Sequence, residues 1–422
     1  MNTKSLKSIL SIVGITLCLP SMAQDIYVNI ENEAVQKYLR EVQYERNDTS
    51  VIMNYLVEGI GRLDLPAPAI IEMPDVEADT IKLIYDEDEA FIDPSTIVVD
   101  KGSKTWPIYN LLPQRTYFYK VMADGEELSV GRIFTDGTLR MVYTPHVRNV
   151  RDLGGWPCAD DKIVRYGKLF RGAELNGEHQ YDSIDVDILM NQIGIASELD
   201  LRANYNIDNN TSVFGFLDAA HTESGQQATY YYTADSGQLP EHLTTYYYQY
   251  RWRREFNFIV DCLKAGNPVY FHCVWGINRT GYLALLLEGL LGVDYSDIVK
   301  DYELTSFYNH GEKKDIIDPV LDYIYGLDGA TLQDKFYYYF VNKLGVSKDN
   351  ISYFLNEMLE DKPISTGVFH NPTPYTRHPA AGIYDLQGRP LSNSRTPELQ
   401  NSRTPELLIE VCDDGSVRKI IR

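Results

Sequence analysis

The sequence predicts an α/β fold in the middle of the chain, preceded by a small β-sandwich. Between residues 142 and 362, segments of helix length alternate with segments of strand length, as they do where helices cover a sheet. Residues 63–141 instead carry short β-branched and aromatic runs separated by Asp, Gly and Pro turns, which is typical of a sandwich. In the central segment an apolar strand also leads through a short loop directly into a strongly apolar helix.

Length and charge limit the classes of protein to consider. At roughly 150 residues per domain, 422 residues predict two to three domains, and a hydrophobic content of 44% is enough for real cores. The net charge is −21, from 39 Lys and Arg against 60 Asp and Glu. We therefore do not expect this protein to bind nucleic acid through a broad basic surface, because such a surface would need an excess of Lys and Arg. An anionic substrate must instead be bound by a local pocket.

The first 23 residues have the composition of a signal peptide. Lys4 and Lys7 precede an apolar run over residues 9–19, and the small residues Ser21 and Ala23 suit a signal peptidase. The run is too short to span a bilayer, and we expect no transmembrane span elsewhere. The sequence predicts an exported protein that starts at Gln24 and resides in the periplasm, at the cell surface or outside the cell.

Residues 24–62 carry apolar side chains at spacings of three and four, which predicts a helical lead segment. In the sandwich that follows, residues 112–119 (Leu-Pro-Gln-Arg-Thr-Tyr-Phe-Tyr) resemble the start of a strand in a fibronectin type III-like module, whose first tyrosine packs in a corner. Here that tyrosine is Tyr117.

Residues 363–422 form a different region, which we interpret as a Pro-rich linker and a short β tail. An octapeptide occurs twice, at 393–400 and 401–408, and a loop lengthened by duplication explains it. The flanking segments 382–389 and 417–422 are predicted strands. They resemble the C-terminal β tails of exported proteins in Bacteroidetes-type bacteria, so a sorting signal is one hypothesis and a simple β appendage the other.

Residues 268–281 carry the pattern that indicates chemistry. A buried strand ends at His272, Cys273 follows it, and Arg279 stands six positions after the cysteine at the start of an apolar helix. The predicted phosphate-binding loop between them consists of Val274, Trp275, Gly276, Ile277 and Asn278.

Such a loop can bind a phosphate dianion. Backbone N–H groups ahead of a helix N-terminus form an anion cradle, and Arg279 can bind two phosphoryl oxygens with its planar guanidinium. The same positive field should lower the pKa of Cys273 and make it a nucleophilic thiolate. Thr280 can donate its hydroxyl to that thiolate, and His272 can support the loop from the strand side.

The His-Cys-x5-Arg-Thr pattern resembles the active-site loop of cysteine-dependent protein tyrosine phosphatases. Three earlier segments narrow the resemblance to the bacterial tyrosine/serine phosphatase family: residues 148–155 (Arg-Asn-Val-Arg-Asp-Leu-Gly-Gly), 169–174 and 199–202. The resemblance implies a mostly parallel central sheet flanked by helices. It implies a phosphoric monoester hydrolase that forms a phosphocysteine on Cys273, uses Arg279 as phosphate clamp and needs no metal or cofactor.

Asn278 departs from the family pattern, in which an Asp before the loop arginine is thought to be the general acid. An amide cannot donate a proton to the leaving oxygen, so Asp152 or Asp235 serves as acid, or the enzyme works without one. Without an acid, a phenol with a pKa near 10 is a better leaving group than an alkyl alcohol, which favours phosphotyrosine. The expected partner is a phosphorylated peptide or small phosphomonoester. The alternatives are an inositol-phosphate or phosphoinositide phosphatase and a phosphate-binding pseudophosphatase.

Overall fold

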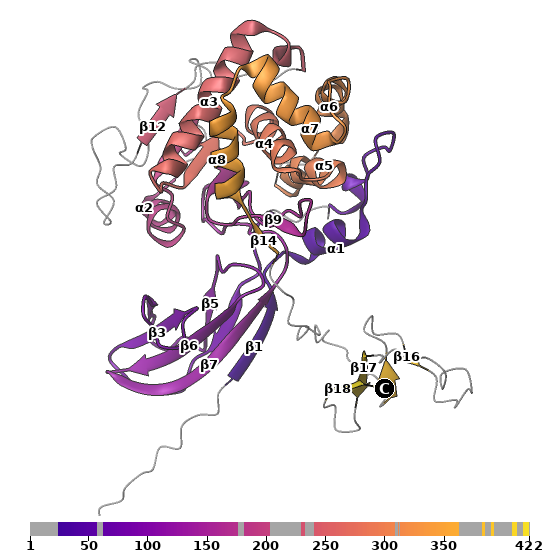
Figure 1. The fold of residues 1–422 in the computed structure, drawn as a ribbon. Helices are drawn as coiled ribbons and strands as arrows, with labels where there is room; N and C mark the ends of the chain where they lie inside the picture. Colours follow the sequence, from indigo (N-terminus) through magenta and orange to yellow (C-terminus); the bar gives the residue numbers. More distant parts are fainter. Residues whose placement is uncertain are drawn as a thin grey trace, which may run out of the picture. The chain divides into compact units, whose positions relative to one another are not determined.

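The computed structural model forms two compact units, Met1–Thr366 and Gly367–Arg422 (Figure 1). The predicted signal peptide lies outside the residues it describes, which are 24–56, 62–175, 181–202, 229–232, 240–308, 311, 313–362, 382–384, 390–391, 407–411 and 417–421.

Two sheets build the N-terminal part of the first unit, and all their strand pairs are antiparallel except β1 with β7. A five-stranded sheet has the order β1-β7-β6-β3-β4, and a separate two-stranded sheet pairs β2 with β5. Side chains of both sheets, among them Ile71, Leu83, Val121 and Ile133, share one apolar core. The strands are β1 (Gln24–Asn29), β2 (Ala69–Glu72), β3 (Ile81–Asp86), β4 (Ser95–Val99), β5 (Thr105–Ile108), β6 (Thr116–Ala123) and β7 (Glu126–Asp136).

The expectation that the lead segment is helical from residue 24 is wrong at its start. Residues 24–29 form a strand, β1, because Ile26 and Val28 alternate along it and pack against the sheet core. This strand runs parallel to β7. Helix α1 (Glu33–Glu41) begins only after Asn32, whose side chain accepts a hydrogen bond from the N–H of Ala34 and caps the helix.

The lead segment is part of the core of the α/β domain. Val35 and Tyr38 of α1 and Ile52 of the short helix η1 (Ile52–Asn54) are buried in the same apolar cluster as the helices that follow. The hydroxyls of Tyr38 and Tyr44 both donate to Oε2 of Glu303, each at 2.7 Å. The lead segment is therefore anchored to the domain that carries the candidate site.

The α/β domain has a sheet of order β12-β11-β13-β10-β8. Strands β12, β11, β13 and β10 run parallel, and β8 pairs with β10 in the antiparallel sense, so the sheet is mostly parallel, as predicted. A second pair joins β9 to β14. The strands are β8 (Arg151–Asp152), β9 (Lys162–Val164), β10 (Leu169–Gly172), β11 (Ser197–Asp200), β12 (Thr229–Tyr232), β13 (Val269–His272) and β14 (Leu359–Asp361).

Helix α4 (Asn278–Leu291) is the centre of the helical layer. Every residue from Arg279 to Leu291 is buried, and α5 and α7 pack against it (Figure 1). A helix that is apolar on all sides requires such surroundings, because it has no face to give to water. The other helices of the domain are α2 (Ser183–Asp187), α3 (Tyr246–Lys264), α5 (Tyr295–Leu304), α6 (Asp318–Tyr325), α7 (Leu332–Tyr338) and α8 (Lys348–Met358).

The second unit contains a four-stranded antiparallel sheet of order β16-β15-β17-β18. Most of the duplicated octapeptide lies outside the described residues. The strands are β15 (Gly382–Tyr384), β16 (Pro390–Leu391), β17 (Leu407–Val411) and β18 (Val417–Ile421).

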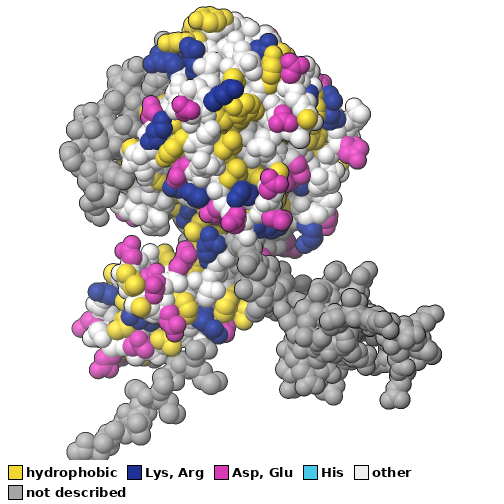
Figure 2. All heavy atoms as spheres, viewed as in Figure 1, with side chains coloured by type: hydrophobic (Ala, Val, Ile, Leu, Met, Phe, Trp, Pro, Cys, Tyr) yellow, Lys and Arg dark blue, Asp and Glu magenta, His cyan; other side chains and the backbone are white. Residues whose placement is uncertain are grey.

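No helix within the described ranges is long and apolar enough to cross a membrane. On the face shown in Figure 2, acidic and basic side chains of the described residues are interspersed.

Candidate active site

The predicted loop lies at the carboxyl end of the central sheet. Strand β13 is hydrogen-bonded to β10 on one side and β11 on the other, and all four of its residues are buried. Cys273 follows the strand directly, and α4 begins five residues later at Asn278. The structure therefore brings together the cysteine, the arginine and the helix N-terminus that the sequence predicts.

Gly276 fits a position in this loop that no other residue could occupy without strain. Its φ is +70°, and a Cβ atom built there would lie 2.4 Å from the carbonyl oxygen of Gly172. Both the left-handed conformation and the close approach of the two backbones require glycine. The contact seats the loop against the end of β10.

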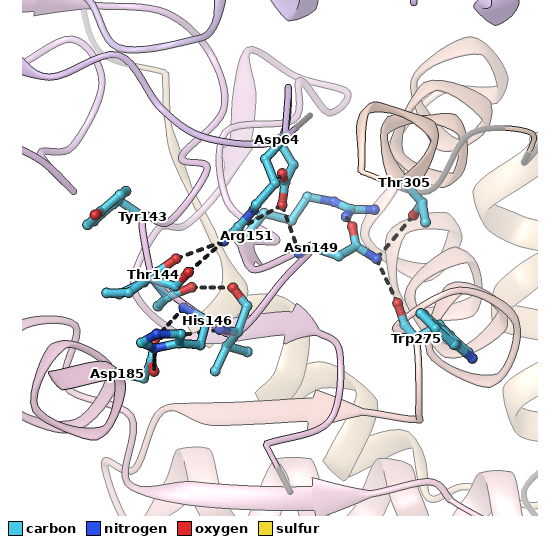
Figure 3. A network of polar contacts seen from close by, with 12 residues as sticks. Asp64, Tyr143, Thr144, His146, Asn149, Arg151, Asp185, Trp275 and Thr305 are labelled. Atoms are coloured by element: carbon cyan, nitrogen blue, oxygen red, sulfur yellow. Dashed lines mark hydrogen bonds and ion pairs between the residues drawn. The ribbon is translucent and has the colours of Figure 1, made fainter. Parts of the chain in front are cut away.

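Two side chains hold the loop carbonyls on its outer side. Asn149 Nδ2 donates to the carbonyl oxygens of Trp275 at 3.2 Å and Gly276 at 3.3 Å (Figure 3). Arg171 Nη2 donates to the carbonyl oxygen of Gly276 at 3.0 Å. Because a trans peptide is planar, the N–H groups of Gly276 and Ile277 point the opposite way, into the loop. These donors are therefore oriented before any anion arrives.

A buried charge cluster fixes those two side chains. Arg151 donates to the side-chain oxygen of Asn149 at 2.6 Å and to Asp301 at 2.9 Å, and Arg171 pairs with the same Asp301. Burial alone would raise the pKa of Asp301, but the two guanidinium groups lower it to about 2. Asp301 is therefore ionised at neutral pH and keeps both arginines in place.

His272 supports the other end of the loop, where the sequence predicted it. Its Nδ1 lies 3.1 Å from the carbonyl oxygen of Cys273, and its Nε2 lies 2.9 Å from Oε1 of Glu198. Burial acts to lower the pKa of His272, but Asp200 and Glu198 outweigh it and raise the pKa. A protonated imidazole donates from both nitrogens. The imidazole of His272 holds the carbonyl oxygen of Cys273 on the outer side of the loop. Because the peptide is planar and trans, the N–H of Val274 then points into the loop.

Cys273 is a buried thiol, 3% exposed, whose pKa is nevertheless lowered. Burial opposes ionisation, but the charge of Arg279, the hydroxyl of Thr280 and the N–H groups of Ile277 and Thr280 stabilise the thiolate more strongly. The buried hydroxyl of Thr280 has no hydrogen-bond partner among the described residues, so it is available to donate to the thiolate. The site has the charge and the nucleophile that attack on phosphorus requires.

The guanidinium group of Arg279 has N–H donors that no described residue of the protein uses. The residue is 8% exposed, and its Nη1 donates to the carbonyl oxygen of Leu201 at 3.1 Å. Its buried Nε has no hydrogen-bond partner among the described residues. An unpaired buried donor on a cation is costly, so the arrangement fits an anion that supplies the missing acceptor.

Neither Asn278 nor Asp152 supplies a proton donor within the described contacts of the loop. Asn278 is exposed, and its Oδ1 accepts a hydrogen bond from the hydroxyl of Tyr302 at 3.3 Å. Asp152 is buried and accepts from the N–H groups of Gly154 at 2.9 Å and Gly167 at 2.7 Å.

Burial raises the pKa of Asp152 to about 6, although Arg140 and those two N–H groups act against it. Its hydrogen bonds hold a turn, which favours the structural alternative for this residue. Asp235 lies outside the described residues.

Sequence reasoning missed the roles of Asn149, Arg151, Arg171 and Asp301. The first three stand in the segments that carry the resemblance, but their contacts join parts of the chain far apart in sequence. One signal was available: Arg171 is charged and lies within an otherwise apolar buried strand.

Two groups of described residues have the composition of a metal site: His146, Asp182 and Asp185, and Glu198, Asp200 and His272. Protein hydrogen bonds account for both. Asp182 and Asp185 form the capping box of α2, in which Asp185 also binds the imidazole of His146 at 2.8 Å. The other group is the buried set beside His272 described above.

Residues 142–362 match the family described as the tyrosine phosphatase family. A protein of Cupriavidus necator, whose name assigns it to the tyrosine-protein phosphatases, is 28% identical over 166 residues, which are 37% of this chain and 59% of that protein. The triple specificity protein phosphatase PtpB of Mycobacterium tuberculosis is 28% identical over 200 residues, 45% of this chain and 67% of its own. Among solved structures, TpbA of P. aeruginosa is 16% identical, covering 42% of this chain and 94% of TpbA, with a TM-score of 0.27.

Proposed function

The chain belongs to the tyrosine phosphatase family, and from this premise we propose that it is a phosphoric monoester hydrolase that cleaves phosphotyrosine through a phosphocysteine on Cys273. One observation carries the proposal: a thiol of lowered pKa lies in a loop whose backbone donors point inward, beside Arg279, whose Nε has no hydrogen-bond partner among the described residues.

In the first step the Cys273 thiolate attacks phosphorus in line with the leaving group. The P–S bond forms as the bond from phosphorus to the tyrosyl oxygen breaks, and that oxygen leaves with the electron pair and takes a proton from solvent. Arg279 and the inward N–H groups bind the nonbridging phosphoryl oxygens. Because the protein holds these donors in place beforehand, little reorganisation is needed when charge develops.

In the second step water attacks the phosphocysteine. The new P–O bond forms as the P–S bond breaks, the thiolate is regenerated, and the proton of the attacking water passes to solvent. The product is inorganic phosphate. The hydroxyl of Thr280, which has no hydrogen-bond partner among the described residues, can donate to the departing thiolate.

Asn278 supports the preference for an aryl ester. It occupies the position of the family's acid, it cannot donate a proton to an ester oxygen, and its side chain is held by Tyr302. A phenolate leaves without protonation far more readily than an alkoxide, because the pKa of phenol is near 10. The named relative PtpB is a triple specificity phosphatase, so a substrate panel must extend beyond phosphotyrosine.

The test compares para-nitrophenyl phosphate and an alkyl phosphate with wild type and Cys273→Ser. We expect wild type to hydrolyse the aryl ester at least about 100-fold faster than the alkyl ester, beyond their difference in solution, and Cys273→Ser to be inactive. Turnover by Cys273→Ser would overturn the thiolate mechanism. A panel of phosphotyrosine peptides, phosphoserine peptides, inositol phosphates and phosphoinositides then tests the substrate class, and a preference for the last two would replace the present proposal.

Export is a separate proposal, supported by the pattern of residues 1–23. The expected result is an N-terminus at Gln24 in protein recovered from outside the cytoplasm of a bacterial host. An uncleaved N-terminus in the cytoplasmic fraction would contradict it.

We further propose that residues 63–141 form a fibronectin type III-like module. Tyr117 is buried, and its hydroxyl accepts a hydrogen bond from the N–H of Leu112 at 2.9 Å, as a tyrosine corner requires. Tyr117→Phe should lower the free energy of unfolding by about 1–3 kcal/mol, since it leaves that N–H without its partner. An unchanged denaturation midpoint would argue against the corner.

A further inference from the structure

Asp64 joins the segment upstream of the matched region to the catalytic loop. It lies outside residues 142–362, at the start of the segment 63–141 and before strand β2, and is 1% exposed. Its Oδ2 accepts a hydrogen bond from the backbone N–H of Asn149 at 2.9 Å (Figure 3). Asn149 is the residue whose amide binds the carbonyl oxygens of Trp275 and Gly276.

Arg62 keeps the Asp64 carboxylate in place. Its Nε and Nη2 bind the two carboxylate oxygens at 3.1 and 3.0 Å, which is the bidentate geometry of a strong pair. Its Nη1 donates to the carbonyl oxygen of Thr144 at 2.9 Å. The pair therefore fixes both ends of the segment from Thr144 to Asn149.

The backbone of Asn149 needs such support. Its φ is +58°, a left-handed conformation that costs a non-glycine residue free energy and persists only where its surroundings enforce it. This conformation lets the backbone N–H face Asp64 while the side chain reaches the loop (Figure 3).

We infer that Asp64 is a positioning residue of the phosphatase, which acts through Asn149 to keep the loop N–H groups of Gly276 and Ile277 directed at the substrate phosphate. The inference rests on the proposed function. It adds a residue from outside the matched family region to the machinery of the site.

The effect on Cys273 follows from the peptide geometry. Without Asp64, Asn149 can leave its left-handed conformation, and its amide then releases the carbonyl of Trp275. The peptide units of the loop are no longer held with their N–H groups inward. The Ile277 N–H that stabilises the thiolate then contributes less, and the phosphoryl oxygens lose a donor.

The experiment measures the pH dependence of iodoacetamide alkylation at Cys273, read by mass spectrometry of its peptide, in the full chain. The variants are Asp64→Ala and Asp64→Asn, and kcat and KM for para-nitrophenyl phosphate are measured in parallel. We expect Asp64→Ala to raise the alkylation midpoint and lower kcat about tenfold or more, with a smaller change in KM. Asp64→Asn should be intermediate, because a neutral acceptor binds the N–H less strongly.

Tyr38→Phe is the matched control. It removes another buried hydrogen bond between the upstream segment and the α/β domain, but Tyr38 binds Glu303 and does not contact Asn149 through any described hydrogen bond. It should lower Tm and leave the alkylation midpoint and kcat at wild-type values. A general loss of stability therefore cannot imitate the expected result.

The outcomes separate the two proposals. A wild-type alkylation midpoint in both Asp64 variants, with a low midpoint in wild type, overturns this inference alone. An ordinary thiol midpoint in wild type overturns the proposed mechanism itself. If Asp64→Ala does not fold, Asp64→Asn decides, and an unchanged midpoint in that variant also overturns the inference.

Discussion

Cys273 combines burial with a lowered pKa, two properties that normally oppose each other. The side chains and N–H groups that resolve this conflict all belong to the loop or the first turn of α4. The thiolate is the form favoured in the folded protein, so its contribution to stability is present above the pKa of an unfolded cysteine and is lost as the pH falls through the lowered value. The acid limb of the activity profile should report the same group.

The Thr280→Ala variant tests how much a single hydroxyl contributes to the lowered pKa of Cys273. Loss of the hydroxyl removes one of the groups that lower the pKa of Cys273. The acid limb of kcat/KM for para-nitrophenyl phosphate should therefore move to higher pH, with a fall in rate at pH 5.5 that is larger than the fall at pH 8. Thr280→Ser keeps the hydroxyl and serves as the control. Parallel losses at both pH values would contradict the prediction.

Asn278 and Tyr302 predict an interaction between two substitutions. In Asn278→Asp the hydroxyl of Tyr302 and the N-terminus of α4 would both stabilise the carboxylate and keep the pKa of the new acid low. The single variant should gain little rate with an alkyl phosphate at pH 7. Asn278→Asp combined with Tyr302→Phe should gain several-fold more, because the new acid retains its proton better.

Steady-state rates of both single variants and the double variant measure this interaction. Additive effects of the two substitutions would show that Tyr302 does not tune the acid. Tyr302→Phe alone controls for disturbance of α5.

The elements β13, loop and α4 follow one another without interruption, so the sequence was able to predict this part of the site. Strand, cysteine, arginine and helix stand within one short segment, and their order determines the anion cradle. Asn149, Arg171 and Asp301 could not be assigned in the same way. They meet because β8 and β10 are paired and α5 packs beside them, and pairing between distant segments is not visible in a local pattern.

Gly276 ties β10 to the loop, and Gly276→Ala should therefore abolish activity. The new Cβ would meet the carbonyl oxygen of Gly172 at 2.4 Å, in a conformation that disfavours it. We expect kcat to fall at least about 100-fold, as when a backbone donor at the reacting oxygen is lost.

The matched control is Gly194→Ala. Gly194 has a φ of +86°, but nothing lies within 4 Å of its Cβ position. It should lose about 1 kcal/mol of stability and no activity. Equal losses of activity in the two variants would contradict the steric argument.

At the scale of the molecule, the upstream residues and the α/β domain are less separable than the sequence suggested. The boundaries drawn at residues 62 and 141 follow changes of composition, but the apolar face of α1 completes the core of the following domain. Its spacing showed an amphipathic helix and could not show which core it joins. The sequence did not predict strand β1, because its six residues are too few to show a clear alternation. The longer helical spacing of apolar residues that follows dominated the prediction for the whole segment.

A chain that begins at residue 142, as the matched region does, should therefore be unstable. It would expose the cluster that covers Tyr38 and leave Glu303 without its two tyrosine partners. We expect poor solubility or a Tm lower than that of the full chain by more than 10 °C, measured by thermal denaturation. A soluble protein with unchanged Tm and kcat would show that the lead segment is dispensable.

The burial of α4 on all sides determines how the loop can fluctuate. Amide hydrogen exchange in the hydrogen-bonded turns of this helix, from Gly281 onward, cannot occur through fraying of a surface segment, because these residues are all enclosed. Exchange there should require opening of the whole domain, with a free energy close to that of global unfolding. The helix that carries Arg279 and Thr280 is then among the most protected parts of the described chain, and heat should remove activity and fold in a single transition.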